Sequence, residues 1–208
     1  MSATETGDRL IAEELRAGLA GRRVGNEIVV VEETRSTNDL CWEAAERGAS
    51  EGFVAFAERQ TAGRGQYGRR WDSAPYRGLW LSVLLRPAMT LRESAQLTSL
   101  LAEAVASTIE EETGCAASIK PPNDIYIADR KVAGVLVEGR NDKEGNYVAV
   151  AGIGINVNQT IADFPEELRA TAGSLAMVTG QVVSRMKLAI ALLRNIENQG
   201  AAVCNRRA

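Results

Sequence analysis

The chain has 208 residues and a formal net charge of −3, and 45% of its residues are hydrophobic, which is typical of one globular domain with a sizeable core. It contains no histidine, which excludes Ser-His-Asp and Cys-His nucleophile systems and histidine-based zinc sites. The balanced charge, without blocks of one sign, argues against general binding to nucleic acids or membrane surfaces. Any reaction must therefore depend on lysine, arginine, carboxylates, backbone amides and a bound ion.

The cysteines and the N-terminus favour a cytoplasmic protein. Cys41, Cys115 and Cys204 are odd in number and lie far apart without metal-ligand spacing, so we expect reduced thiols. The N-terminal sequence MSATETGDRL lacks the pattern of a signal peptide. No apolar stretch reaches the roughly 20 residues that would span a bilayer.

Hydrophobic spacing and turn residues predict helices and strands along the whole chain. In chain order we expect a helix at 8–20, a strand at 28–31, a helix at 36–47, a strand at 53–57, a loop at 60–77, a strand at 78–85, a helix at 91–113, strands at 117–120, 125–128, 131–138 and 147–157, a short helix from Pro165 and a helix at 182–198. Hairpin-connected strands with helices gathered between them favour an α+β fold with a mixed, largely antiparallel sheet flanked by helices.

The segment from Gln60 to Trp71 is rich in glycine and arginine. Glycines let backbone N–H groups approach an anion closely, and Arg64, Arg69 and Arg70 add forked donors for phosphate or carboxylate. The order of residues matches neither a Walker A motif nor a dinucleotide-binding fingerprint. Considered alone, the segment is either an anion-binding loop or a solvated, flexible one; a single cluster in an acidic chain disfavours an RNA contact.

A second segment, Lys120 to Ile125, places two prolines between predicted strands. The prolines restrict the backbone, so Lys120, Asn123 and Asp124 should be held in place. Considered alone, this segment is either a ligand-contacting turn or simply a turn.

A third segment, Asp129 to Glu138, is a predicted strand that begins with a lysine. Strict alternation would place Lys131 on the same face as Ala133 and Val135, an apolar face that meets a core or a pocket. Lys131 is then either a strand-end lysine whose ammonium reaches water or a pocket-rim lysine that holds a phosphate or carboxylate.

A fourth segment, Ala151 to Asn158, carries glycine at alternate positions, Gly152 and Gly154. Such spacing leaves bare backbone on one face of a strand, where either a ligand or another part of the core can approach closely.

Taken together and in this order, the segments resemble the motif series of biotin protein ligases over roughly residues 8–200. The series consists of Ser36-Thr37-Asn38, Gln60 with Gly63-Arg64-Gly65 and Gly68-Arg69 through Trp71, Lys120 with Pro122-Asn123-Asp124, Lys131 with Ala133-Gly134 and Val137-Glu138, and Gly152 with Gly154-Ile155-Asn156.

The resemblance implies the class II aminoacyl-tRNA synthetase-like fold of biotin/lipoate ligase catalytic domains. It also implies ATP-dependent conversion of biotin to biotinyl-AMP, with magnesium accompanying ATP, and transfer of biotin to a lysine of the biotin carboxyl carrier domain of acetyl-CoA carboxylase. We expect residues 1–24 to form a short helical segment and residues 25–208 the catalytic domain. No N-terminal winged helix and no C-terminal β-domain is visible, so DNA binding is not expected; a homodimer is compatible with the family.

The resemblance assigns roles by position. The residues matched to biotin binding are Ser36, Thr37, Asn38, Gln60, Gly63, Arg64, Gly65, Lys131, Gly134 and Gly152. The residues matched to ATP or adenylate binding are Arg64, Gly65, Gln66, Arg69, Trp71, Lys120, Asn123, Asp124 and Asn156. The catalytic residues are expected to be the cations Lys131, Arg64, Arg69 and Lys120, and no protein metal site is expected. An ionised carboxylate can attack the α-phosphate without acid–base help, so positioning and charge neutralisation suffice.

Two positions depart from the family pattern. Gln66 stands where arginine is usual, and we expect weaker retention of biotinyl-AMP from that change. Pro121 replaces a tryptophan of the usual Lys-Trp-Pro-Asn-Asp motif. A lipoate or octanoate ligase-type enzyme and a truncated relative that binds biotinyl-AMP without turnover remain as alternatives.

Overall fold

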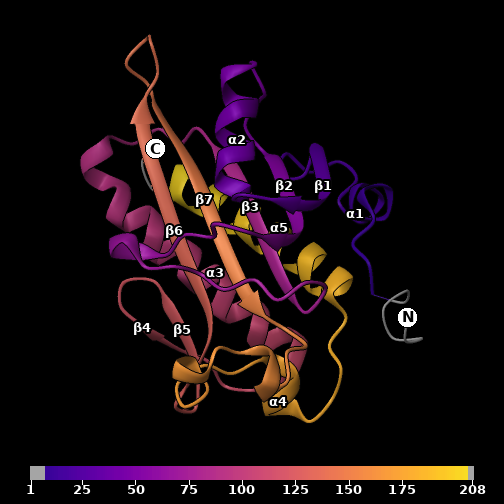
Figure 1. Cartoon of the computed structure of the whole chain (residues 1–208). Helices are drawn as coiled ribbons and strands as arrows, with labels where there is room; N and C mark the ends of the chain where they lie inside the picture. The colour runs from indigo at the N-terminus through magenta and orange to yellow at the C-terminus, as the bar shows by residue number, and fades with distance from the viewer. Residues whose placement is uncertain (1–7, 206–208) are drawn as a thin grey trace.

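Seven strands form a single sheet with helices on both faces (Figure 1). The computed structural model describes residues 8–205 of the chain and the side chains of residues 8–199. The strand order is β1-β2-β3-β7-β6-β5-β4; β1 and β2 are parallel, and every other neighbouring pair is antiparallel. The predicted α+β fold with a mixed, largely antiparallel sheet is therefore confirmed.

The elements follow the predicted order along the chain. The strands are β1 (Glu27–Thr34), β2 (Phe53–Gln60), β3 (Gly78–Leu85), β4 (Ser118–Lys120), β5 (Asp124–Ile127), β6 (Arg130–Asn141) and β7 (Tyr147–Asn156). The α-helices are α1 (Ala12–Gly18), α2 (Thr37–Glu46), α3 (Ser94–Thr113), α4 (Leu175–Thr179) and α5 (Arg185–Asn205), and short 3-10 turns lie at Gln66–Gly68, Leu91–Glu93, Ile161–Asp163 and Glu166–Leu168. None of the helices in the described part of the chain is both long and apolar enough to cross a membrane.

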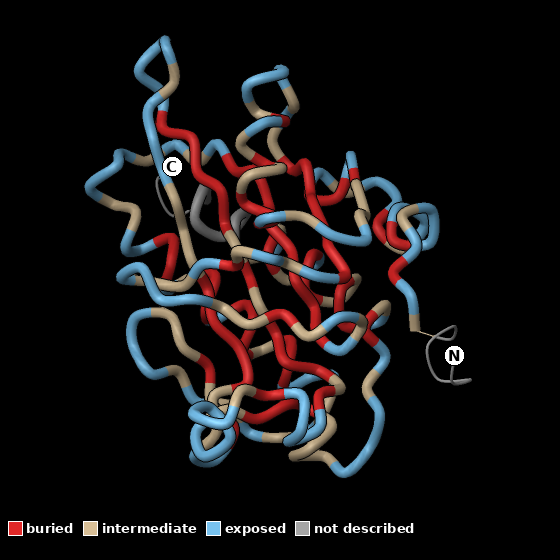
Figure 2. The backbone as a smooth tube through the Cα atoms, in the orientation of Figure 1, coloured by how far each residue is buried: buried red, intermediate tan, exposed pale blue. Residues whose placement is uncertain are grey.

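The central strands are buried on both faces, as Figure 2 shows by the red tube beneath blue surface loops. Along β7, Ala149, Ala151 and Ile153 belong to the main core, which also contains side chains of α3 and α5. Val148 and Val150 point to the opposite face, into a smaller core beneath α2. This alternation gives each face of the sheet its own hydrophobic cover.

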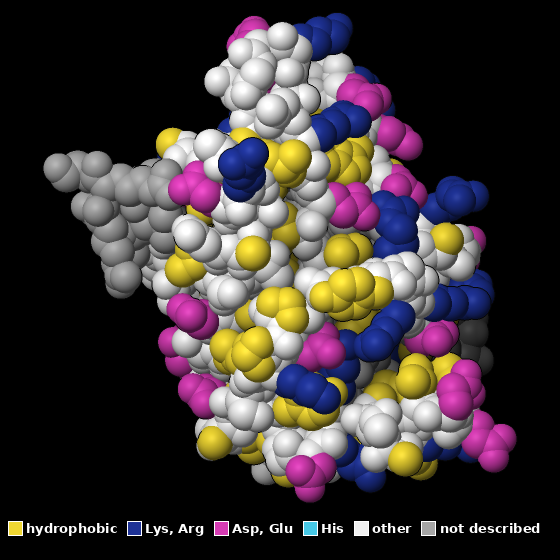
Figure 3. Space-filling view, turned by 90° about the vertical axis from the view of Figure 1, so that its left-hand side faces the viewer, with side chains coloured by type: hydrophobic (Ala, Val, Ile, Leu, Met, Phe, Trp, Pro, Cys, Tyr) yellow, Lys and Arg dark blue, Asp and Glu magenta, His cyan; other side chains and the backbone are white. Residues whose placement is uncertain are grey.

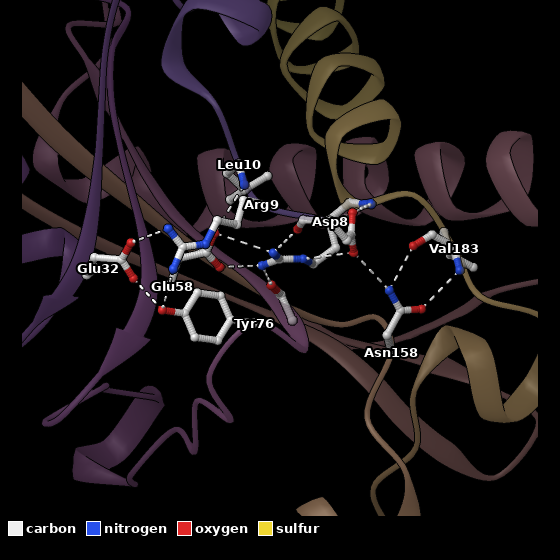
Figure 4. Close-up of polar contacts among 10 residues, drawn as sticks. Asp8, Arg9, Leu10, Glu32, Glu58, Tyr76, Asn158 and Val183 are labelled. Atoms are coloured by element: carbon white, nitrogen blue, oxygen red, sulfur yellow. Dashed lines mark hydrogen bonds and ion pairs between the residues drawn. The ribbon is translucent and has the colours of Figure 1, made fainter. Parts of the chain in front are cut away.

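The segment before β1 packs against the main core and is attached to the rest of the domain by a buried arginine. Leu15 of α1 is fully buried in the main core. Arg185, at the start of α5, forms ion pairs with Asp8 (3.1 Å) and Glu58 (2.6 Å) and donates to the Gly78 carbonyl (3.1 Å). Figure 4 shows how these contacts join the N-terminal segment to β2, to β3 and to the start of α5.

The predicted alternation along β6 is wrong near its start, because the strand contains a bulge. Tyr126 of β5 pairs with Lys131, while the preceding residue of β5 pairs with Ala133, so Val132 is the extra residue. Val132 and Ala133 both belong to the main core, whereas the Lys131 side chain lies near Gly134 on the other face. The bulge thus turns the lysine away from the core and towards the face that carries α2.

Three helical elements differ from the prediction in length, type or presence. The helix predicted at 8–20 is shorter, Ala12–Gly18; the helix predicted from Pro165 is one 3-10 turn, Glu166–Leu168; and α4 was not predicted. Such short elements are stabilised by tertiary packing more than by their own sequence, so local patterns specify them poorly.

Some predictions concern residues that the structure does not describe. Residues 1–7, which make up most of the segment MSATETGDRL, and residues 206–208 lie outside the described chain. The side chain of Cys204 is not described either. Cys41 and Cys115 are free cysteines. Burial raises the pKa of the Cys41 thiol to about 12.

Candidate active site

The candidate site lies on the sheet face that also carries α2. Val148 and Val150 of β7 pack beneath that helix, and further along β7 the same face presents Gly152 and Gly154. The segment of residues 60–77, here called the site loop, crosses in front of β6 and β7 (Figure 1). The site is therefore where the helix cover ends and the bare backbone of the glycines begins.

A group of polar side chains, here called the amide cluster, lies at the start of α2. It consists of Ser36, Thr37, Asn38, Gln60 and Ser82. Gln60 Oε1 accepts from the Thr37 backbone N–H (2.9 Å), and the Ser82 hydroxyl lies 2.5 Å from Asn38 Oδ1, to which it donates. These bonds join α2 to β2 and β3, so contacts within the chain hold the cluster in place.

One donor of the amide cluster has no acceptor. Asn38 Nδ2 is buried and has no hydrogen-bond partner among the described residues. The amide lies close against β7, because a Cβ at Gly152 would overlap it. A buried unsatisfied donor costs about 1–3 kcal/mol, which the carbonyl of a bound ligand would offset. The cluster is thus suited to a polar, uncharged group.

Trp71, in the second half of the site loop, covers the glycines of the sheet. A Cβ at Gly154 would come within 2.5 Å of the Trp71 ring, and one at Gly134 within 3.0 Å. Trp80 of β3 meets the ring edge-on, with centroids 6.2 Å apart. Only glycine allows the indole to lie this close to the strands, so the glycine spacing of β6 and β7 creates an aromatic wall for the site.

Lys131 supplies a cation beside this wall. Its ammonium lies 2.6 Å from the Asp124 carboxylate and 5.3 Å from the centre of the Trp71 ring. The side chain is 29% exposed, so a ligand can reach it. A partly buried ammonium next to an aromatic ring is suited to a carboxylate or phosphate.

Arg64 lies between two carboxylates. Its Nη2 donates to Asp39 of α2 (2.8 Å), and its Nε donates to Glu138 of β6 (3.0 Å). The hydrogen bond to Asp39, followed by that to Glu138, raises the pKa of Arg64 above its usual value. The site loop is therefore attached near its tip to both α2 and β6.

The tip itself is a small hairpin. The Gly65 N–H donates to the Arg69 carbonyl (2.7 Å), and the Trp71 N–H donates to the Gly63 carbonyl (2.9 Å). Gln66 lies in the 3-10 turn at the tip, and the side chain of Arg69 is exposed with no hydrogen-bond or ion-pair partner among the described residues. The side chain of Arg69 is therefore available to a ligand.

The remaining predicted residues lie at the edges of the site. Lys120 is exposed at the end of β4, with its ammonium 6.0 Å from the centre of the Tyr126 ring. Asn123 Nδ2 donates to the Val135 carbonyl (2.9 Å), and Asn156 Oδ1 accepts from Gln159 Nε2 (3.0 Å). The two asparagine amides therefore bond within the protein, whereas Lys120 remains available to a ligand.

The structure adds residues that sequence reasoning missed. Ser82 is a polar residue in the otherwise apolar strand sequence GLWLSVLL, and this exception was a usable signal. Glu138 belongs to the motif series but was given no role, and Asp39 was not singled out, because the role of both depends on Arg64, which lies 74 and 25 residues away in the sequence. Only the folded chain reveals such a contact.

Charged side chains of both signs are mixed on one face of the molecule. On the face shown in Figure 3, Lys and Arg are interspersed with Asp and Glu. Among the described residues, no group of three or more His, Cys, Asp or Glu side chains could hold a metal ion. The candidate site instead offers the cations Arg64 and Lys131, each beside a carboxylate.

Comparison with known proteins gives a consistent result. The family model described as "Biotin/lipoate A/B protein ligase family" matches residues 30–158. The bifunctional ligase/repressor BirA of Bacillus subtilis (strain 168) is 40% identical over 85% of this chain, and the biotin–[acetyl-CoA-carboxylase] ligase of Mycobacterium tuberculosis (strain H37Rv) is 35% identical over 88%. The alignments cover 54% and 68% of those proteins, so this chain spans about half the length of its Bacillus relative.

A solved structure supports the same relationship. The biotin protein ligase from Aquifex aeolicus in complex with biotin and ATP superimposes with a TM-score of 0.72 and 34% identity, over 85% of this chain and 71% of that one. The family model covers more than half of the described chain and includes the amide cluster, the site loop, Lys131 and the glycines of β7. The chain belongs to the biotin/lipoate A/B protein ligase family.

Proposed function

We propose that this chain is the catalytic part of an ATP-dependent biotin protein ligase. It would convert biotin and ATP to biotinyl-AMP and then transfer biotin to a lysine of a biotin carboxyl carrier domain, such as that of acetyl-CoA carboxylase. The Mycobacterium tuberculosis relative is a biotin–[acetyl-CoA-carboxylase] ligase, and the Aquifex aeolicus neighbour binds biotin and ATP. The proposed enzyme works in the cytoplasm, in keeping with the free cysteines Cys41 and Cys115.

The observation that carries the proposal is the sequence of environments across the site. At one end, the amide cluster contains a buried donor without an acceptor, Asn38 Nδ2. In the middle lie the Trp71 ring and the glycines beneath it; at the other side lies the Lys131 ammonium. Biotin has the matching parts in the same order: a polar, uncharged ureido ring, an apolar body and a carboxylate.

The chemistry requires cations more than acids and bases. A carboxylate oxygen of biotin attacks the α-phosphorus of ATP, a new oxygen–phosphorus bond forms, and pyrophosphate leaves. Lys131 is placed to orient the carboxylate and to balance charge on the phosphate, and Arg64 adds a second cation. In the second step the carrier lysine amine attacks the acyl carbon and AMP leaves with the bonding electrons.

The peripheral residues take supporting roles in this proposal. Arg69 and Lys120 are exposed cations that can meet the phosphates of ATP. Asn123 and Asn156 hold the adenylate side in shape through their bonds within the protein. Magnesium bound with ATP would neutralise charge on the phosphates, and the Asp124 carboxylate, which pairs with Lys131 at 2.6 Å, would be the protein group nearest to hold it.

The proposal is tested by incubating the purified chain with a carrier domain, ATP, magnesium and either biotin or lipoate. We expect pyrophosphate release that requires biotin, followed by a carrier mass increase of one biotinyl group. Loading of lipoate instead would support a lipoate ligase, and biotinyl-AMP binding without transfer would support a non-turnover relative.

Lys131→Met should slow biotinyl-AMP formation about 30- to 1,000-fold, which corresponds to roughly 2–4 kcal/mol of transition-state stabilisation. The matched control is Lys143→Met, which removes an exposed lysine at the β6–β7 hairpin and should leave the rate unchanged. An Lys131→Met enzyme that forms biotinyl-AMP at the normal rate would contradict the assignment.

A further inference from the structure

We propose that Asp39 and Glu138 are positioning residues for Arg64. Together they form what we call the carboxylate clamp, which attaches the site loop to α2 and β6 through Arg64. The inference rests on the proposed ligase function where it concerns substrate, because Arg64 is one of the cations assigned to the reaction. The clamp itself consists of contacts within the chain, so it can be tested without substrate.

The clamp uses one side of the guanidinium and leaves the other side open. Glu138 accepts from Arg64 Nε at 3.0 Å and from Nη2 at 3.4 Å, and Asp39 accepts from Nη2 at 2.8 Å. Nη1 has no hydrogen-bond partner among the described residues. Two carboxylates therefore fix the plane of the guanidinium, and the remaining N–H groups stay available to an anionic ligand.

The carboxylate at position 138 is itself held in place. Trp42 Nε1 of α2 donates to Glu138 Oε2 at 2.9 Å. The Trp42 ring also packs against Arg140, whose guanidinium carbon lies 4.2 Å from the ring centre. Glu138 is thus held by contacts between α2 and β6, so its carboxylate is a fixed acceptor for Arg64 of the site loop.

The site loop needs such a fixed point. Near its tip, the hairpin is closed by the bonds of Gly65 and Trp71, while Tyr67, Arg69 and their neighbours are exposed. Loops of this composition are mobile unless they are attached. The bonds of Arg64 to α2 and β6 attach the tip, so without them we expect the loop to open and release a bound ligand faster.

The first experiment needs no ligand. Hydrogen exchange of residues 63–71 is compared in the wild type, Asp39→Asn, Glu138→Gln and the double variant; glutamine can still accept from Trp42. We expect exchange in the loop to be about 3- to 5-fold faster in each single variant and about 10-fold faster in the double variant, the range for partly exposed ion pairs. The matched control is Glu46→Gln, which removes the Arg140–Glu46 ion pair (3.0 Å) between the same two elements and should leave the loop unchanged.

The second experiment measures function. Glu138→Gln should raise the KM for biotin and the rate of biotinyl-AMP release by about 3- to 5-fold, with kcat for adenylation changed less than 2-fold. In an Arg64→Met background, adding Glu138→Gln or Asp39→Asn should have no further effect on either quantity, because the carboxylates act through Arg64. A general effect on folding, or a loss of favourable charge at the start of α2, would persist in that background.

Three results would overturn the proposal: unchanged loop exchange in the double variant, equal effects with and without Arg64, or tighter biotin binding in the variants. The last result would mean that the carboxylates compete with the ligand for Arg64. If the wild type fails to biotinylate a carrier, the proposed function is wrong, yet the ligand-free exchange experiment still decides whether the clamp exists.

Discussion

Two arginines in this protein each lie between two carboxylates, yet their surroundings are opposite. Arg185 is 0% exposed and pairs with Asp8 and with Glu58, which is 4% exposed. Arg64 is 38% exposed and pairs with carboxylates that are 36% and 28% exposed. The first pair of bonds joins the N-terminal segment and β2 to the start of α5; the second lies at the candidate active site.

The difference shows how burial decides what an ion pair does. All three nitrogens of the Arg185 guanidinium have partners, including the carbonyls of Gly78 and Asp8. A buried charge must be satisfied in this way, because an unpaired one is costly. The exposed Arg64 gains less from its partners and keeps Nη1 unbonded to the described chain, so it can respond to a ligand. One arginine is structural and the other is available for function.

The largest effect is expected from Arg185→Met. Removing the guanidinium leaves Glu58 buried without its counter-charge, so the free energy of unfolding should fall by about 3–5 kcal/mol, measured by urea denaturation. Changing Glu58→Gln as well should recover part of the loss. A variant as stable as the wild type would mean that the buried Arg185 contributes no more to the free energy of unfolding than the exposed Arg64.

A smaller effect on stability, but a clear one on activity, is expected from Arg64→Met. The free energy of unfolding should change by less than about 1 kcal/mol, because the pair is partly exposed. Biotinyl-AMP formation should slow by about 30- to 1,000-fold, from the loss of a cation worth roughly 2–4 kcal/mol at the transition state. The comparison fails if Arg64→Met destabilises the fold as much as Arg185→Met.

The smallest effect is expected from salt. At 1 M ionic strength the screening length is about 3 Å, so the bonds of Arg64 should weaken and hydrogen exchange in residues 63–71 should become about 2-fold faster. The backbone N–H of Leu10, which donates to Glu58 at 3.1 Å, should exchange at an unchanged rate. Equal responses at the two places would contradict the claimed difference in burial.

Much of the fold was predictable because it depends on local patterns. The apolar run of β3 and the long amphipathic helix that ends at Gly114 are specified by side-chain periodicity and by a glycine with φ of +70°. The face of Lys131 was not predictable in this way, because the bulge at Val132 shifts the alternation. A bulge depends on pairing with β5, which periodicity along one strand does not encode.

The motifs of the candidate site were also visible in the sequence, but their partners were not. The glycines of β7 and the polar residues at the start of α2 indicated close approach and hydrogen bonding. The unsatisfied donor of Asn38 and its contact with Gly152 became evident only in the folded protein. Ser82 lies in the amide cluster because β3 pairs with β7, which places Ser82 opposite Gly152.

Periodicity and composition were enough to predict the α+β class, the order of most elements and the set of cations available for chemistry. Which carboxylate meets which arginine became evident only in the folded chain. Arg185 meets Asp8 across 177 residues, and Arg64 meets Glu138 across 74. The physical reason is that local sequence specifies the type of each element, whereas the face of a residue beside a bulge and the partner of a side chain depend on strand order and register across the whole sheet.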